Sequence, residues 1–142
     1  MGNLFFFLVI YLMSVYVVQS VIIRGPVCAN YYHYQVFVYH SISISQDAVP
    51  LRTYCASKDK HIGYKILNYG ESLDWDFCNF PEKPRTFTCH LMWGSKLAIF
   101  ESFNATLAPA CGGRDNDCSW FARADGVYFD QQKMIDWGNV RT

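Results

Sequence analysis

The segment Thr86-Phe-Thr-Cys-His-Leu-Met-Trp93 alternates two kinds of side chain along the chain. Every second position is large and apolar or is a cysteine, while Thr86, Thr88 and His90 take positions between them. Successive side chains of a β-strand point to opposite faces of a sheet, so this period of two predicts a strand with one buried face. The apolar face consists of Phe87, Cys89, Leu91 and Trp93.

The same alternation recurs on both sides of this segment and is interrupted by turn-forming residues. Further strands are expected at residues 36–44, 51–57, 62–66, 73–77, 97–103, 118–123 and 126–129, the last two as a hairpin around Asp125-Gly126. No stretch beyond the first 23 residues has a helical period. Short strands with one apolar face each must bury those faces against one another. The sequence therefore predicts an all-β fold, a disulfide-stapled antiparallel β-sandwich of about seven or eight strands.

Composition agrees with this fold and excludes some partners. The chain has 142 residues, with twelve basic side chains balanced by twelve acidic ones. No long-range field would therefore gather nucleic acid or an acidic membrane surface. The ten Tyr, eleven Phe and four Trp favour β structure, because bulky aromatic side chains suit a pleated, half-buried surface.

The first residues predict secretion. Residues 1–23 carry no charged side chain, and residues 4–18 are almost wholly apolar. Val18 and Ser20 are suitable small residues for a signal peptidase site, so residues 1–20 are read as a signal peptide cleaved after Ser20. The alternative is an uncleaved membrane anchor, since 23 uncharged residues are long enough to span a bilayer. After cleavage no membrane insertion is expected, and the mature protein is extracellular.

The mature chain then divides into three parts. Residues 21–34 form an N-terminal extension, residues 35–130 form one sandwich domain, and residues 131–142 form a patternless tail that we expect to be loose, although Trp137 could dock. No repeat or composition break divides the domain further.

Six cysteines in a small secreted domain indicate a disulfide framework. Cys55, Cys89 and Cys118 fall on the apolar phase of their strands, where a disulfide between the sheets would lie, and Cys111 lies just before Cys118. Cys78 falls on the opposite phase and Cys28 precedes the first strand, so these two are expected to form a separate peripheral disulfide. Fifteen pairings of six cysteines are possible, and the other bonds stay open.

Asn104-Ala-Thr106 is an N-glycosylation sequon in a polar stretch. A secreted chain passes the glycosylating machinery, so Asn104 is expected to carry a glycan.

The order of these features resembles the plant self-incompatibility proteins, also called S-protein homologues. The resemblance covers about residues 35–129. It rests on the strand Val36–Ile42, on Leu51-Arg-Thr-Tyr-Cys-Ala-Ser-Lys-Asp59, on Thr86-Phe-Thr-Cys89 leading to Trp93, and on Cys118-Ser-Trp120 followed by Asp125-Gly-Val-Tyr128. Cys28 and Cys78 lie outside the four-cysteine pattern of the family.

This resemblance implies a small secreted β-sandwich protein of plants. The best-understood members are pistil-side signals that a receptor on incompatible pollen recognises, and most homologues have no assigned role. The implied partner is an extracellular protein, a cell-surface receptor above all. The residues themselves also allow a secreted lectin-like or defence protein that binds glycans or pathogen molecules.

No catalytic, cofactor or metal site is expected. His40 lies on an apolar strand face and is interpreted as a hydrogen-bonded core residue. His90 is interpreted as a solvated or partner-facing residue, and Asp74 with Asp76 as an exposed polar face rather than a glycosidase pair. The histidines lack zinc-ligand spacing, and no serine lies in a Gly-x-Ser-x-Gly turn. A hydrolase is therefore the least favoured reading.

Two charged loops are the candidate binding surface, because recognition is commonly built on loops that a rigid scaffold holds in place. The first consists of Lys58, Asp59 and Lys60. The second, between Cys111 and Cys118, contributes Arg114, Asp115, Asn116 and Asp117.

Overall fold

The computed structural model describes residues 2–19, 28–29, 31–43 and 49–141, and the side chains of residues 14–19 lie outside that description. One helix, α1 (Gly2–Gln19), precedes the strands. Within these residues there are ten strands: β1 (Tyr32–His40), β2 (Leu51–Ser57), β3 (His61–Leu67), β4 (Ser72–Asn79), β5 (Phe87–Trp93), β6 (Lys96–Phe103), β7 (Asp117–Arg123), β8 (Gly126–Phe129), β9 (Gln132–Ile135) and β10 (Gly138–Asn139). A 3-10 turn, η1 (Ala108–Ala110), lies between β6 and β7.

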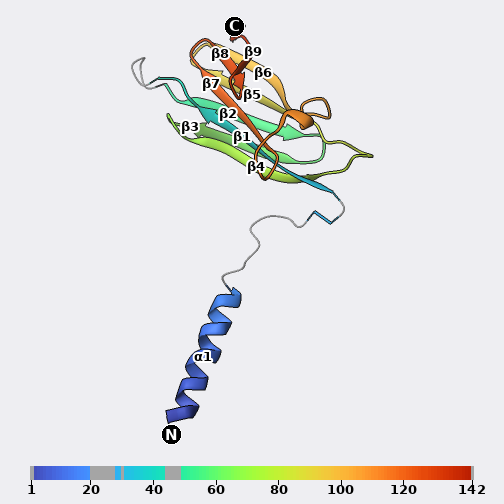
Figure 1. Ribbon diagram of the computed structural model, residues 1–142. Coiled ribbons are helices and arrows are strands. Elements are labelled where there is room, and N and C mark those ends of the chain that lie inside the picture. Colours follow the sequence, from blue (N-terminus) through green and yellow to red (C-terminus); the bar gives the residue numbers. More distant parts are fainter. Residues whose placement is uncertain (1, 20–27, 30, 44–48, 142) are drawn as a thin grey trace.

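The strands form two sheets that face each other (Figure 1). The first sheet has the order β4-β1-β7-β8-β9, and the second has the order β10-β6-β5-β2-β3. The predicted all-β sandwich is confirmed, with ten strands in the described residues instead of seven or eight. One pairing departs from the antiparallel expectation: β1 runs parallel to β7. Parallel neighbours need a long crossover, and here five strands intervene between β1 and β7: β2, β3, β5 and β6 of the second sheet and β4 of the first.

The apolar phases of both sheets meet in one aromatic core. Phe77 of the first sheet packs against Phe87 and Phe103 of the second, with ring centroids 4.7 Å apart in each pair. Trp120 lies between Phe100 and Phe129, and its indole nitrogen donates to the Ser102 carbonyl at 2.9 Å. Such ring pairs stabilise a core by about 0.5–1.5 kcal/mol each beyond the area that they bury.

Strand β3 does not bury the face that its alternation suggests. Tyr64 and Ile66 are 59% and 51% exposed, and of the strand's residues Leu67 is the one fully buried. The reason is register: Tyr64 pairs with Tyr54, whose strand neighbours Thr53 and Cys55 face the core. A strand at the edge of a sheet takes its facing from its partner, so Tyr64 and Ile66 are left exposed to solvent.

The prediction that residues 131–142 form a loose tail is also wrong, because residues 132–139 contain β9 and β10. Strand β9 extends the first sheet beside β8, and β10 pairs with β6 at the edge of the second. Trp137 docks as anticipated. Its indole nitrogen donates to the Arg123 carbonyl at 2.7 Å, and its ring lies 6.1 Å from that of Trp93. The segment has no period of its own because each strand is only two to four residues long.

The structure resolves the open question of disulfide pairing. Cys28 bonds Cys78, as expected. Cys55 bonds Cys89, and Cys111 bonds Cys118. The expected disulfide between the two sheets is therefore wrong. Cys55 and Cys89 lie opposite each other on the adjacent strands β2 and β5, with their Cα atoms 4.2 Å apart, so this bond joins neighbours within one sheet.

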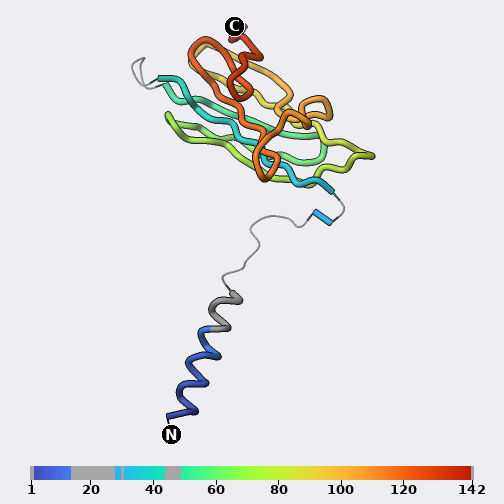
Figure 2. Tube along the Cα trace, viewed as in Figure 1, coloured from blue at the N-terminus to red at the C-terminus, as the bar shows by residue number. Residues whose placement is uncertain are grey.

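Helix α1 stands apart from the sandwich in Figure 2. Its described side chains, from Leu4 to Met13, are all exposed. In the part of the chain that the structure describes, no helix combines the length and the apolar character needed to cross a membrane. The predicted cleavage point after Ser20 lies outside the described residues.

Candidate recognition surface

Three connections lie at one end of the sandwich, which we call the loop end. They are the β2–β3 turn (residues 58–60), the β4–β5 loop (residues 80–86) and the β6–β7 connection (residues 104–116). Register places them together: β5 begins opposite the end of β2 and the end of β6, and β1 begins opposite the end of β4. Because the β4–β5 loop joins the two sheets directly, the loop end is shared by both.

A serine holds the β2–β3 turn in shape. The Ser57 hydroxyl donates to Oδ1 of Asp59 at 3.0 Å and accepts from the Lys60 amide at 3.0 Å, while the Ser57 amide donates to the Lys60 carbonyl at 2.7 Å. The hydrogen bond from Ser57 lowers the pKa of the Asp59 carboxyl, so this group stays ionised. Lys58, Asp59 and Lys60 are all exposed. The predicted loop is thus a fixed turn with three charges on its surface.

The side-chain amide of a buried asparagine holds the β4–β5 loop in place. Oδ1 of Asn79, a residue only 7% exposed, accepts from the Arg85 amide at 3.0 Å. The Lys83 amide donates to the Phe80 carbonyl at 3.1 Å, which closes a turn over Pro81 and Glu82. The Phe80 ring packs 4.0 Å from that of Tyr31.

These two connections enclose a pocket of about 410 Å³. The β2–β3 turn contributes Lys58 and Asp59 to its wall, together with Ser57 at the end of β2. The other lining residues come from the β4–β5 loop: Phe80, Lys83, Pro84, Arg85 and Thr86. Pockets of roughly 300–1,000 Å³ are the usual size of sites that take a small group.

The β6–β7 connection is closed into a small disulfide-bonded loop. Gly112 and Asp117 exchange two backbone hydrogen bonds, at 3.0 and 2.6 Å, beside the Cys111–Cys118 bond. Arg114 and Asp115 are exposed at its tip, whereas Asn116 and Asp117 are partly buried. Burial, together with the charge of Asp115, raises the pKa of the Asp117 carboxyl. Its Oδ1 has no hydrogen-bond partner among the described residues.

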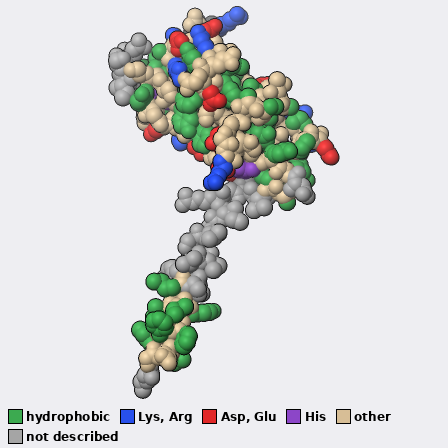
Figure 3. Space-filling view, in the orientation of Figure 1, with side chains coloured by type: hydrophobic (Ala, Val, Ile, Leu, Met, Phe, Trp, Pro, Cys, Tyr) green, Lys and Arg blue, Asp and Glu red, His purple; other side chains and the backbone are tan. Residues whose placement is uncertain are grey.

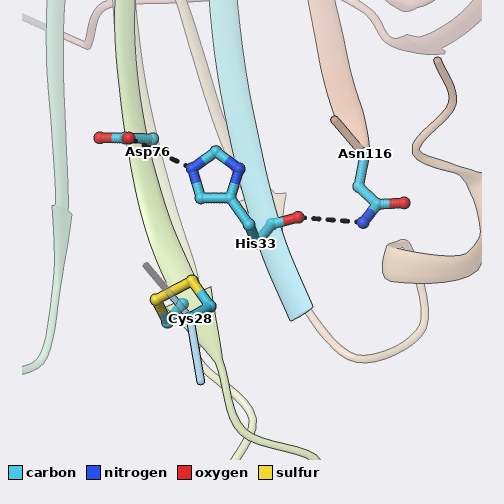
Figure 4. A network of polar contacts seen from close by, with 5 residues as sticks. Cys28, His33, Asp76 and Asn116 are labelled. Atoms are coloured by element: carbon cyan, nitrogen blue, oxygen red, sulfur yellow. Dashed lines mark hydrogen bonds and ion pairs between the residues drawn. A yellow bond between two sulfur atoms is a disulfide. The ribbon is translucent and has the colours of Figure 1, made fainter. Parts of the chain in front are cut away.

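Figure 4 shows how this loop is tied to the start of β1. The Asn116 amide nitrogen donates to the His33 carbonyl at 2.9 Å, and Nε2 of His33 lies 3.2 Å from Oδ2 of Asp76 on β4. The Cys28–Cys78 disulfide lies just beyond this pair. The contacts fix three segments that are far apart in sequence, so the loop end is a rigid surface.

The sequon residue lies in the same connection. Oδ1 of Asn104 accepts from the Leu107 amide at 2.8 Å, and its Nδ2 donates to Oε2 of Glu101 at 2.5 Å. Ala105 and Thr106 are exposed. A glycan on Asn104 would therefore stand at the loop end.

The predicted candidate residues separate into three groups. Lys58 and Asp59 line the pocket, whereas Lys60, in the same turn, does not. Arg114 and Asp115 project from a different connection of the same end, while Asn116 and Asp117 help to hold that connection in place. Sequence reasoning missed Phe80, Lys83 and Arg85. The available signal was the spacing of Pro81 and Pro84 around basic residues, which indicates a rigid charged loop but not its neighbour.

The histidines and acidic residues that sequence reasoning considered are distributed over the described strands. His40 is 4% exposed, and its Nδ1 accepts from the Ile42 amide at 3.2 Å, which agrees with a hydrogen-bonded core residue. His90 and Asp74 are exposed on strands. His33 with Asp76 is the pair that sequence reasoning overlooked, and no described hydroxyl or free thiol is hydrogen-bonded to the ring. The described residues contain no cluster of His, Cys, Asp and Glu that could hold a metal ion.

Fold and loop end define a class of protein: a small disulfide-linked β-sandwich with a rigid set of charged loops at one end. The sequence model of one family, described as plant self-incompatibility protein S1, matches residues 35–139. The chain belongs to this family. The match extends past residue 130, which agrees with β9 and β10 as parts of the domain.

Relatives of known name agree with this assignment. S-protein homolog 21 of Arabidopsis thaliana is 29% identical over 85 residues, which are 59% of this chain and 64% of that protein. S-protein homolog 29 of the same plant is 25% identical over 117 residues, 80% of this chain and 84% of that protein. The first match thus spans slightly less than two thirds of the relative's length.

A solved structure shares the fold. It is described as a structure of Self-Incompatibility Protein Homologue proteins, a widespread family of small, highly stable, secreted proteins from plants. The superposition has a TM-score of 0.55 and 18% identity, and it covers 75% of this chain and 96% of the other. Secretion of that family agrees with the extracellular location expected from residues 1–20.

Proposed function

We propose that this chain is a secreted plant recognition protein that binds a protein on a cell surface through its loop end. The family to which it belongs takes its name from self-incompatibility, a process of recognition between cells. The observation that carries the proposal is that three charged connections lie together at one end of the sandwich, and that two of them, the β2–β3 turn and the β4–β5 loop, line one pocket. Binding surfaces are commonly built on loops that a scaffold positions.

The proposal involves no catalytic step. A histidine that acts as a base on a nucleophile usually has a serine, threonine or cysteine within hydrogen-bond reach, and the hydrogen bonds of the described histidine rings include no such partner. Nδ1 of His61 lies 2.9 Å from the Tyr54 hydroxyl, but this pair is exposed and neither residue lines the loop-end pocket. The exposed charges at the loop end instead suit an interface rim, where they set the rate and the specificity of encounter.

Binding of the secreted protein to intact plant cells tests the proposal. We expect saturable binding that disappears when the cells are first treated with protease. The triple variant Lys58→Ala, Lys60→Ala and Arg114→Ala should weaken it about tenfold, because each lost rim charge contributes up to roughly 1 kcal/mol.

Lys96→Ala is the matched control. Lys96 lies at the β5–β6 turn, at the opposite end of the second sheet, where its ammonium group sits 5.2 Å from the centre of the Trp93 ring. This variant should bind as the unmodified protein does. Equal weakening by the control, or binding that survives protease, would contradict recognition of a protein through the loop end.

Glycan binding is the second candidate, and the outer face of the second sheet favours it. Tyr54 and Tyr64 lie opposite each other on β2 and β3, and they are 37% and 59% exposed. Exposed aromatic rings offer an apolar face with a polar hydroxyl, which suits stacking of sugar rings. A glycan array with Tyr64→Ala as the comparison would separate the two candidates, because the loop-end variant would leave glycan binding unchanged.

A further inference from the structure

The pocket at the loop end carries a local excess of positive charge on a chain that is neutral as a whole. Lys58, Lys83 and Arg85 line it, against the single carboxylate of Asp59. No ion pair joins any of these three cations to an acidic group in the described parts of the chain. Glu82 belongs to the same loop but does not line the pocket.

Asp59 does not neutralise this excess. Its carboxylate accepts from the Ser57 hydroxyl, and its pKa is lowered by that bond, so it stays a single negative charge opposite three positive ones. Two of the cations also come from a loop whose backbone is fixed. The Arg85 amide is bonded to buried Asn79, and the Lys83 amide is bonded to the Phe80 carbonyl. The backbone that carries these two cations is therefore fixed before any ligand arrives, which lowers the entropy cost of binding.

The wall also has an apolar part. This part consists of Phe80, whose ring is held by its contact with Tyr31, and of Pro84. A compact acidic group on an apolar stem, such as a glutamate side chain next to a hydrophobic one, matches both parts of the lining.

A linear polyanion is a poorer match than such a peptide. Polyanions are bound along a row of cations that follows their backbone. Figure 3 shows basic and acidic side chains interspersed over the face in view, without a continuous basic stripe.

We propose that the pocket formed by the β2–β3 turn and the β4–β5 loop binds an acidic, partly hydrophobic peptide segment of the partner protein, through Lys58, Lys83 and Arg85. This inference rests on the proposed function, because it names the chemistry of the partner at the loop end. Bidentate contact of the Arg85 guanidinium with a carboxylate would supply the strongest single interaction.

Titration of the secreted protein with a labelled peptide of alternating Glu and Phe tests this. Binding should saturate, should weaken as salt is added, and should be absent for the same peptide with Lys in place of Glu. The double variant Lys83→Glu and Arg85→Glu should weaken binding at least tenfold. Lys96→Glu, which makes the same kind of charge change at the opposite end, should leave it within about twofold.

Folding of the variants is checked by near-ultraviolet circular dichroism. Lys83→Gln, at an exposed position, serves as a milder change that still removes one charge, and it should weaken binding about threefold to fivefold. The inference is overturned if the acidic peptide does not bind, if the control variant weakens binding as much as the double variant, or if polygalacturonate binds the pocket more tightly than the peptide.

The two proposals fail separately. Protease-sensitive cell binding that persists in the Lys83→Glu and Arg85→Glu variant would overturn the pocket inference and leave recognition through the loop end standing. Peptide binding at the pocket without any binding to plant cells would overturn recognition of a cell-surface protein instead.

Discussion

His40 shows how one polar residue is accommodated in the core of this protein. Burial lowers the pKa of its imidazole below 6.5, and the hydrogen bond with the Val49 backbone and the charge of Glu71 oppose that change. The folded protein therefore holds the neutral ring, and protonation favours the unfolded chain.

Stability should consequently depend on pH through His40. The unfolded chain binds the proton more tightly than the folded one, so the free energy of unfolding falls as the pH drops below about 6.5. The slope from this residue is at most about 1.4 kcal/mol per pH unit. Urea denaturation of the protein and of His40→Gln between pH 7.5 and about 5 measures it. An identical pH dependence in both would refute the assignment.

Gly126 illustrates a close approach between strands. A Cβ atom at this position would lie 2.5 Å from the Ile135 carbonyl oxygen and 2.7 Å from Cε of Lys133, and the backbone φ is +156°. The lysine could move aside, but the carbonyl belongs to β9 and could not.

We expect Gly126→Ala to lower the free energy of unfolding by about 1–3 kcal/mol, since overpacking forces a backbone shift. Gly112→Ala is the matched control because a Cβ there meets nothing within 4 Å and φ is not positive. Its change should stay within about 0.5 kcal/mol in the same denaturant titration. Similar losses for both variants would show that crowding at Gly126 is not the cause.

At the scale of elements, the three disulfides constrain different lengths of chain. Cys28–Cys78 spans 50 residues, Cys55–Cys89 spans 34 and Cys111–Cys118 spans 7. In the loop-entropy account these lengths correspond to roughly 4, 4 and 2.5 kcal/mol, because a longer loop loses more freedom in the unfolded chain.

Two of these bonds allow a matched comparison, since all four of their cysteines are buried. Replacing Cys55 and Cys89 with Ala should lower the free energy of unfolding by about 1.5 kcal/mol more than replacing Cys111 and Cys118. Limited proteolysis should show the opposite order, because loss of Cys111–Cys118 opens the β6–β7 connection while the sheets remain intact. Earlier cleavage of the Cys55/Cys89 variant would contradict this division of roles.

At the scale of the whole molecule, two predictions concern its passage out of the cell. The first is removal of residues 1–20. N-terminal sequencing of the secreted protein should begin at or within a few residues of Val21, because Val18 and Ser20 meet the small-residue requirement of the peptidase. A secreted product that begins at Met1 would contradict it.

The second is a single N-glycan on Asn104. Treatment of the secreted protein with an N-glycosidase should increase its mobility in gel electrophoresis. Thr106→Ala should abolish that shift and leave stability unchanged, because Thr106 is exposed and the Asn104 side chain keeps its hydrogen bond with the Leu107 amide. Asn104→Gln is a poorer control, since it removes that bond. A shift that persists in Thr106→Ala would place the glycan elsewhere.

The sequence alone predicts part of the candidate recognition surface. Lys58 and Asp59 are predicted loop residues, and both line the pocket. Lys83 and Arg85 were not predicted, because they become neighbours of Lys58 only when β5 pairs with β2. Asn116 carries no signal of its bond to the His33 carbonyl, which lies 83 residues away. Local patterns describe single elements, whereas a pocket is made of contacts between them.

The sequence by itself determined strands β1 to β8 and the class of fold, because alternation of apolar side chains is a local property that each of these strands carries independently. It also predicted the Cys28–Cys78 bond, from the phase of Cys78 on its strand and the position of Cys28 before the first strand. Only the tertiary structure decided that β1 runs parallel to β7, that Cys55 bonds Cys89 within one sheet, and that Tyr64 faces solvent. An alternation with a period of two indicates that a strand has one apolar and one polar face. Which face is buried, and which strand lies beside it, depends on the register between segments that are distant in the chain.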